Sequence, residues 1–256
     1  EISACLVGSE MCIRDSLDGV APLNFHLLAS QPATPVVTGH LDSLITLDVA
    51  EADDAERARR REALGEPYRT LLGHFRHEVG HFYWSVLGRD PVFVAGFRER
   101  FGDEQIDYQA ALQRHYENGP PPDWQTTWIT AYASCHPWED WAECWAHFLH
   151  LSDAVQTACA HGLRFNGERL IGSEGSPMID AAMPRPLDAR TLAEQWPLAG
   201  DVLLDAWQPI SLLVNDLNRA VGMPDAYPFV VSKPVRDKIA FISEQARLLA
   251  QRSGGG

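Results

Sequence analysis

Two histidines and a glutamate fall within one five-residue run, His77-Glu78-Val79-Gly80-His81. Residues four apart lie on the same face of an α-helix, so the imidazoles of His77 and His81 can bind one metal ion together. Glu78 directly follows the first histidine, where its carboxylate can reach a water on the metal rather than the metal itself. The run therefore predicts a zinc site with His77 and His81 as ligands and Glu78 as a general base for hydrolysis.

A catalytic zinc usually has three protein ligands and one open position, so a third ligand must come from elsewhere in the chain. The segment that begins at His136 is the obvious source. Glu139, Glu143 and His147 recur there every four residues and would share one face of a helix. Two carboxylates on one face among aromatic side chains need a cation to offset the cost of burying them. Glu139, Asp140 and His136 are therefore the candidate third ligands in this segment.

Helices must position these side chains. A proline suited to a first turn, an apolar stripe at helical spacing and Gly88 as a stop signal together predict one helix over residues 67–87. A second helix is expected to start near Pro137, which would put the candidate third ligand in its first turn. The apolar stripe of the first helix consists of Leu71, Leu72, Phe75, Val79 and Phe82.

Short β-prone segments precede the first motif. Strands are expected at residues 35–38 and 44–49 with a turn at 39–43, and the second strand is expected at a sheet edge, where it could align an extended peptide. The pattern predicts a mainly helical α+β fold, with a small sheet before the motif helix and a helical C-terminal part. Further helices are expected at residues 53–64, 93–101, 107–116, 189–196, 202–221 and 234–251, and a long loop at 162–186.

Composition narrows the classes of partner. The 256 residues, 45% of them hydrophobic, suffice for one sizeable domain, and the formal net charge of −14 argues against a nucleic-acid groove. No apolar run has the length of a membrane span, so no membrane association is expected. Outside the first sixteen residues the cysteines are sparse and odd in number, which favours a reducing compartment and a cytoplasmic location. They are Cys135, Cys144 and Cys159.

The first sixteen residues differ in character from the rest. Residues 6–16 resemble a translated sequencing-library adapter, and residues 1–16 have neither the basic start nor the apolar run of a signal peptide. We therefore treat residues 1–16 as an artefact, residues 17–251 as one domain, and the glycine-rich residues 252–256 as a flexible tail.

Other polar residues have plainer interpretations. Glu51, Asp53 and Asp54 could read a peptide amino terminus at one end of a cleft, but an acidic helix start explains them equally well. His74 and His150 are expected at the surface, although His74 shares the motif helix and could touch the site. A group of tryptophans near the second motif is expected to pack in the core rather than form a substrate box, namely Trp138, Trp141 and Trp145.

The two motifs together resemble the glutamate-type zincins, in which the third ligand lies on a helix downstream of H-E-x-x-H and a further acid follows it four residues later. The resemblance implies that Glu139 is the zinc ligand and that Glu143 holds a ligating histidine by its other ring nitrogen. Some of these enzymes carry a catalytic tyrosine seven positions before the ligand. Tyr132 occupies that position here.

A closer resemblance is to a bacterial family described as zinc-binding metallopeptidases, and it covers nearly all of residues 20–250. It rests on segments 51–54, 74–84, 136–143 and 227–229. Members of that family usually carry a cysteine-rich zinc ribbon before the peptidase domain. None is visible here, as expected if the chain begins after it.

The sequence therefore favours a single-domain zinc peptidase that acts on a peptide or protein substrate. Glu78 would take a proton from the attacking water and deliver it to the leaving amine, and Tyr132 would stabilise the oxyanion. The alternative is a non-catalytic zinc-containing module of the same fold that binds peptides or a partner. The oligomeric state has no signature in the sequence.

Overall fold

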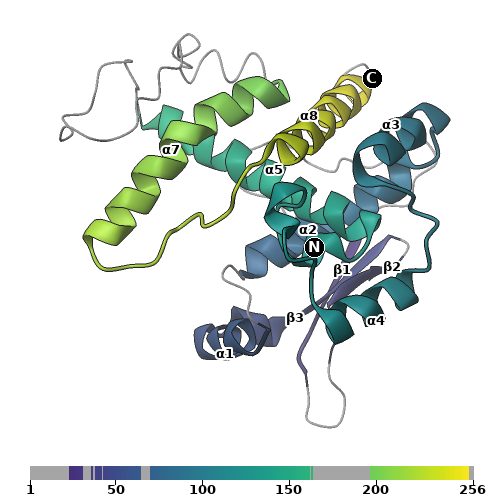
Figure 1. The fold of residues 1–256 in the computed structure, drawn as a ribbon, viewed down its shortest axis with the longest axis horizontal. Coiled ribbons are helices and arrows are strands. Elements are labelled where there is room, and N and C mark those ends of the chain that lie inside the picture. The colour runs from purple at the N-terminus through teal and green to yellow at the C-terminus, as the bar shows by residue number, and fades with distance from the viewer. Residues whose placement is uncertain are drawn as a thin grey trace.

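The computed structural model describes residues 23–30, 36, 38–41, 43–64, 70–161, 163 and 197–253. Helices predominate, and a small sheet precedes them in the chain (Figure 1). This confirms the expected mainly helical α+β class. The segment 1–16 and the expected helix at 189–196 lie outside the described residues, as does the expected loop at 162–186 apart from residue 163.

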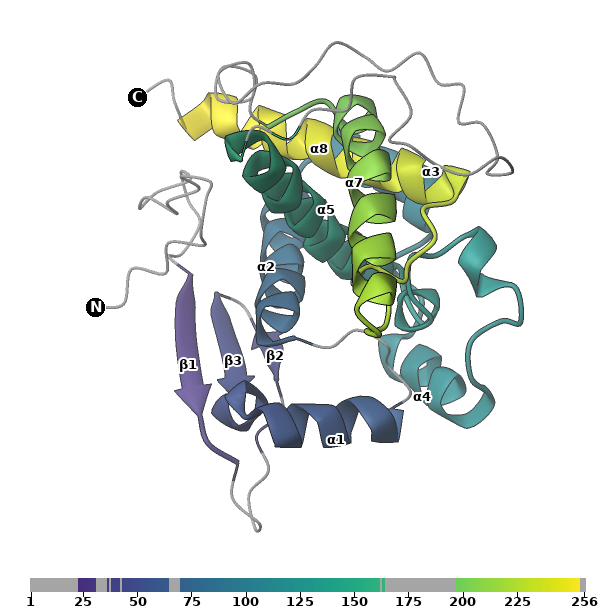
Figure 2. The same ribbon diagram turned by 90° about the vertical axis from the view of Figure 1, so that its left-hand side faces the viewer.

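The described sheet has the strand order β1-β3-β2 (Figure 2). β1 (Asn24–Leu28) pairs in parallel with β3 (Leu44–Asp48), and β2 (Gly39–Leu41) pairs with β3 in antiparallel fashion. The prediction that β3 forms an edge was wrong, because the other two strands flank it. β2 lies within the segment expected as a turn, since its pairing with β3 leaves only two residues for the reversal.

Two further sequence predictions for this region need correction. β1 was not expected, because most of its side chains are exposed and its sequence lacks the alternation of a half-buried strand. The strand expected at 35–38 is not seen at residues 36 and 38, the two of its positions that are described. Thr38 instead accepts a side-chain hydrogen bond from the backbone N–H of Asp48 at 3.3 Å.

The motif helix, α2 (Leu71–Leu87), begins later than expected. Thr70 is its N-cap, and the Thr70 hydroxyl accepts a hydrogen bond from the backbone N–H of Gly73 at 2.9 Å. Gly88 closes the helix as expected. Most of the predicted apolar stripe faces the interior, but Leu72 is 45% exposed. The capping hydroxyl therefore sets the start of the helix, and Pro67 lies outside the described residues.

The second motif lies on α5 (Pro137–Ala160), which crosses α2 closely. Gly80 lies at the crossing, where a Cβ atom would come within 3.0 Å of the Ala142 Cα and the Trp145 Cβ. The Trp141 indole N–H donates to the Gly80 carbonyl at 2.8 Å. Trp141 and Trp145 are fully buried, as expected of core residues. The glycine inside the first motif thus lets the two helices that carry the candidate ligands approach each other.

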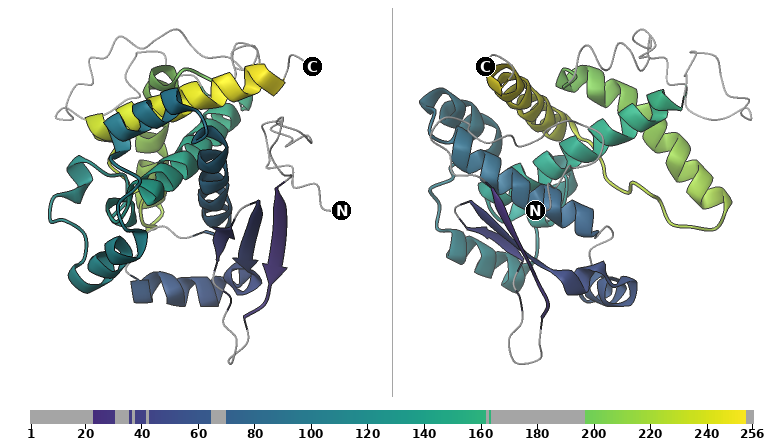
Figure 3. Two further views of the ribbon diagram at one scale, coloured as in Figure 1. Left: turned by 90° about the vertical axis from the view of Figure 1, so that its right-hand side faces the viewer. Right: turned by 180° about the vertical axis from the view of Figure 1, so that it is seen from behind.

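α3 (Pro91–Phe101), α7 (Gly200–Ala220) and α8 (Lys233–Ser253) pack against α5 (Figure 3). α2 and α5 lie between the sheet on one side and the C-terminal helices on the other (Figure 2). α8 ends two residues inside the expected tail, and residues 254–256 are outside the described range. The other helices match the predicted segments closely: α1 (Asp54–Leu64), α3 (Pro91–Phe101), α4 (Tyr108–Asn118), α7 (Gly200–Ala220) and α8 (Lys233–Ser253).

Candidate metal centre

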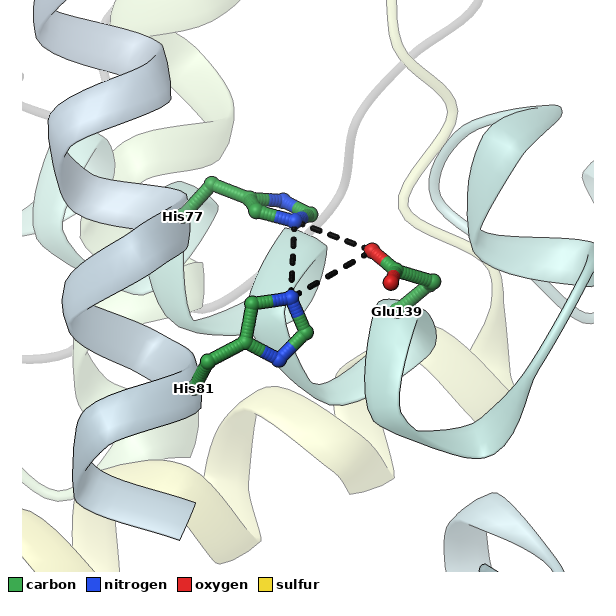
Figure 4. Close-up of side chains that lie close together, drawn as sticks. All are labelled: His77, His81 and Glu139. Atoms are coloured by element: carbon green, nitrogen blue, oxygen red, sulfur yellow. Dashed lines mark hydrogen bonds and ion pairs between the residues drawn. The ribbon is translucent and has the colours of Figure 1, made fainter. Parts of the chain in front are cut away.

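The structure brings His77, His81 and Glu139 together at the crossing of α2 and α5 (Figure 4). The Nε2 atoms of the two histidines lie 3.1 Å apart. The Glu139 Oε2 atom lies 3.0 Å from the His77 Nε2 and 3.4 Å from the His81 Nε2. Three potential ligand atoms from two helices therefore converge on one point.

This triangle has the size that a zinc ion requires. Zinc–nitrogen and zinc–oxygen bonds of about 2.0–2.1 Å in a tetrahedral site place neighbouring ligand atoms about 3.3 Å apart. The Glu139 Oε2 atom is buried and makes no hydrogen bond of standard geometry. A buried carboxylate oxygen aimed at two imidazole nitrogens without such a bond suits a cation at their centre. The three residues fit a metal ion.

Glu143, one helical turn after Glu139, orients the first histidine. The His77 Nδ1–H donates to the Glu143 Oε1 at 2.7 Å, and this bond turns the Nε2 atom toward Glu139 and His81. Burial alone raises the pKa of a carboxyl group, but the hydrogen bond from His77 holds the pKa of Glu143 below its ordinary value. The structure thus brings together the pair that the sequence predicted.

The electrostatic environment favours positive charge at this point. Burial opposes ionisation of Glu139, yet the two histidines hold the pKa of its carboxyl well below its usual range. Burial likewise lowers the pKa of His77, but Glu139 and Glu143 outweigh it and raise that pKa well above its ordinary value. Two carboxylates therefore attract a positive charge to the His77 ring.

The two predicted catalytic residues are Glu78, which adjoins a ligand in the chain, and Tyr132, whose ring lies near that ligand. Glu78 is 7% exposed and follows His77 on α2. Tyr132 begins the short η3 turn (Tyr132–Ser134), and its ring centre lies 6.1 Å from that of His77. Burial raises the pKa of Tyr132 above its ordinary value, so the phenol keeps its proton at neutral pH.

The two alternative third ligands have other partners. His136 is the N-cap of α5, where its Nδ1 accepts from the Trp138 N–H at 3.0 Å and its Nε2–H donates to the Ile106 carbonyl at 3.2 Å. Asp140 forms an ion pair with Lys238 at 2.6 Å. Glu139 is thus the residue of this segment that faces the histidines.

The acidic segment before α1 has a structural role. Glu51 is buried and forms ion pairs with Arg60, at 3.0 Å, and with His74. The Asp53 carboxylate accepts from the Glu56 N–H at 2.8 Å and so caps α1. These contacts support the acidic-helix-start interpretation, and they place His74 against Glu51 instead of in the metal cluster.

Two histidines further along α5 are buried or partly buried. His147 is buried, and its Nδ1 is hydrogen-bonded to the Tyr227 hydroxyl at 2.9 Å. His150 was expected at the surface but is partly buried, with its Nδ1 2.5 Å from the Arg76 guanidinium. Burial lowers the pKa of His147 to about 4 and that of His150 to about 3. Both rings are therefore neutral at pH 7.

Sequence reasoning missed Tyr108, whose hydroxyl donates to the Glu139 Oε1 at 2.6 Å. Asp107 signals a helix start, and its carboxylate accepts from the Ala110 N–H at 2.9 Å. That signal locates the helix but does not reveal that its first side chain reaches α5. No spacing rule links residues that lie on separate helices.

Comparison with known proteins agrees with these features. The sequence profile of the family described as "Putative zinc-binding metallo-peptidase" matches residues 6–245. The chain belongs to this family. It is also 42% identical, over 221 residues, to uncharacterized proteins of Mycobacterium bovis and of two strains of Mycobacterium tuberculosis.

These matches cover 86% of the chain but 59% of each mycobacterial protein, so the chain spans less than two thirds of the relatives' length. No solved structure matches the chain significantly. Within the described parts of the fold, none of the helices combines the length and apolar character that a bilayer span requires.

Proposed function

We propose that the chain is a zinc-dependent peptidase whose metal is held by His77, His81 and Glu139. The observation that carries the proposal is the convergence of two imidazole nitrogens and one buried carboxylate oxygen at mutual distances of 3.0–3.4 Å. Two histidines and a glutamate are a donor set used by catalytic zinc sites, which keep a fourth position open. The family to which the chain belongs supports the same interpretation.

A zinc ion in this site would supply Lewis acidity, which polarises a carbonyl group and lowers the pKa of a water molecule toward about 7. Glu78 would accept the proton of the attacking water and pass it to the leaving amine, because it follows His77 on the helix that borders the site. Tyr132 would donate a hydrogen bond from its phenol to the developing oxyanion and keep its proton. One such donor is typically worth about 2.7–4 kcal/mol in the transition state.

The sheet offers a means of aligning an extended peptide. β2 forms an edge of the described sheet and lies against α2, whereas the originally expected strand β3 has neighbours on both sides. An edge strand presents unpaired backbone groups that can pair with a substrate main chain. We therefore assign to β2 the substrate-aligning role first expected for β3.

A peptide-hydrolysis assay tests the proposal. Zinc-loaded protein should cleave members of a broad peptide library, and removal of the metal with a chelator should abolish cleavage until zinc is restored. Glu78→Gln should retain zinc but lose about 10²–10⁴-fold in turnover, because an amide cannot accept the proton of the water.

Glu99→Gln is the matched control, since the Glu99 side chain is 73% exposed on α3. It should hydrolyse the library like the wild type. Zinc binding without hydrolysis of any peptide would favour the alternative, a non-catalytic peptide- or partner-binding module. Normal turnover in Glu78→Gln at equal zinc content would exclude Glu78 as the base.

A further inference from the structure

Tyr108 is held firmly against the start of α5. It is the first residue of α4, and its ring packs against those of His136 and Trp138, with ring centres 5.1 Å and 6.0 Å away. The hydrogen bond from His136 to the Ile106 carbonyl ties the chain just before Tyr108 to the N-cap of α5. The phenol therefore has a defined position relative to the next residue of α5, Glu139.

The Tyr108 hydroxyl is hydrogen-bonded to one of the two carboxylate oxygens of Glu139. It donates to Oε1 at 2.6 Å, while Oε2 points at the two histidine Nε2 atoms. A phenol has an ordinary pKa of about 10 and so carries at neutral pH the proton needed for this bond. A carboxylate bound in this way presents a single oxygen to a metal ion.

We infer that Tyr108 is a positioning residue, which holds Glu139 so that Oε2 alone faces His77 and His81. This inference rests on the proposed metal site. It goes beyond the predicted ligands because it assigns the geometry of the carboxylate to a residue on a third helix. The division of roles is testable: Tyr108 should govern how tightly zinc binds, and Tyr132 should govern turnover.

The experiment compares three single substitutions, Tyr108→Phe, Tyr132→Phe and the control Tyr116→Phe, which lies on the same helix and is 69% exposed. Zinc affinity is measured by competition with a chromophoric chelator, and the Co²⁺-substituted proteins are compared by visible absorption. Tyr108→Phe should weaken zinc binding about 10–100-fold, as expected when the outer partner of a ligand is lost, and should change the cobalt spectrum. Tyr132→Phe should lower turnover about 10²–10³-fold while zinc affinity stays near that of the wild type.

A coupled substitution separates the hydroxyl–carboxylate bond from packing of the ring. In a Glu139→Asp background the shorter carboxylate is withdrawn from the phenol, so adding Tyr108→Phe should cost less than about twofold in zinc affinity. An equal cost in both backgrounds would overturn the inference, and so would wild-type zinc affinity in Tyr108→Phe alone. Absence of zinc binding by the wild-type protein would instead overturn the proposed metal site, and this inference with it.

Discussion

Two histidine–glutamate contacts lie one helical turn apart on α2. They differ in the source of the positive charge that compensates each buried carboxylate. His74 contacts Glu51, and His77 contacts Glu139. Both glutamates are 1% exposed, so both carboxylates have lost nearly all contact with water. Without compensation, burial of either charge would be costly.

At the first contact, the chain itself supplies the cation. The Arg60 guanidinium reaches Glu51 at 3.0 Å and Asp48 at 2.8 Å. A third buried acid, Asp140, is neutralised in the same way by Lys238. At the second contact, the ion pairs seen for Glu139 and Glu143 in the described part of the chain are with histidines alone. A buried carboxylate that faces imidazoles and has no arginine or lysine partner is therefore a position where an external cation fits.

The largest expected effect comes from exchanging the two glutamates in turn for alanine. Glu139→Ala should weaken zinc binding by more than about 100-fold, since loss of a ligand exceeds the 10–100-fold cost of losing an outer partner. Glu51→Ala should retain the metal, because Glu51 binds Arg60 and His74 instead. Elemental analysis after dialysis measures both. Zinc loss in Glu51→Ala, or full retention in Glu139→Ala, would show that the two contacts are not distinct in kind.

Removal of an internal cation should destabilise the fold rather than the metal site. Lys238 is 2% exposed, and its ammonium group reaches Asp140 and the Thr127 carbonyl at 2.6 Å and 2.8 Å. Lys238→Met leaves a buried carboxylate uncompensated, so we expect a loss of about 3–5 kcal/mol in the free energy of unfolding. Urea titration of the metal-free protein gives this value.

The double substitution of Lys238→Met with Asp140→Leu is the control for that experiment. Removing both charges should recover much of the lost stability, because no unpaired ion remains. If the double variant were as unstable as Lys238→Met, packing rather than charge would explain the loss.

The smallest effect concerns pH and Asp48. Burial raises the pKa of its carboxyl, but Arg60, Ser30 and the Ala50 N–H outweigh burial and lower the pKa to about 2 from 3.8. A depressed folded-state pKa stabilises the protein above the unfolded value, and that stabilisation disappears as the pH falls through the folded value. Asp48→Asn should therefore be less stable than the wild type at pH 6, and the difference should shrink between pH 4 and pH 2, as judged by urea midpoints. A difference independent of pH would mean that the charge of Asp48 contributes nothing.

Local rules account for the parts of the fold that the sequence predicted. The spacing of His77 and His81 depends only on helix periodicity, and so does the placement of Glu139 and Glu143 on one face of a second helix. Helix positions were likewise readable from caps, prolines and apolar spacing. Choosing Glu139 over its neighbour Asp140 relied on resemblance to a family pattern, and the structure brings Glu139 to the histidines.

The sequence by itself thus determined the helices, the histidine pair and the chemistry of the donor atoms, because these depend on residue type and on spacing along one helix. Tertiary structure alone decided which strand forms the edge beside α2, that Arg60 and Lys238 neutralise Glu51 and Asp140, and that Tyr108 reaches Glu139 from 31 residues away. Each of those outcomes depends on how separate elements pack, as at the close approach of Gly80 to Ala142 and Trp145. Contacts between elements arise from the packing of the whole core, and no periodicity within a single segment encodes them.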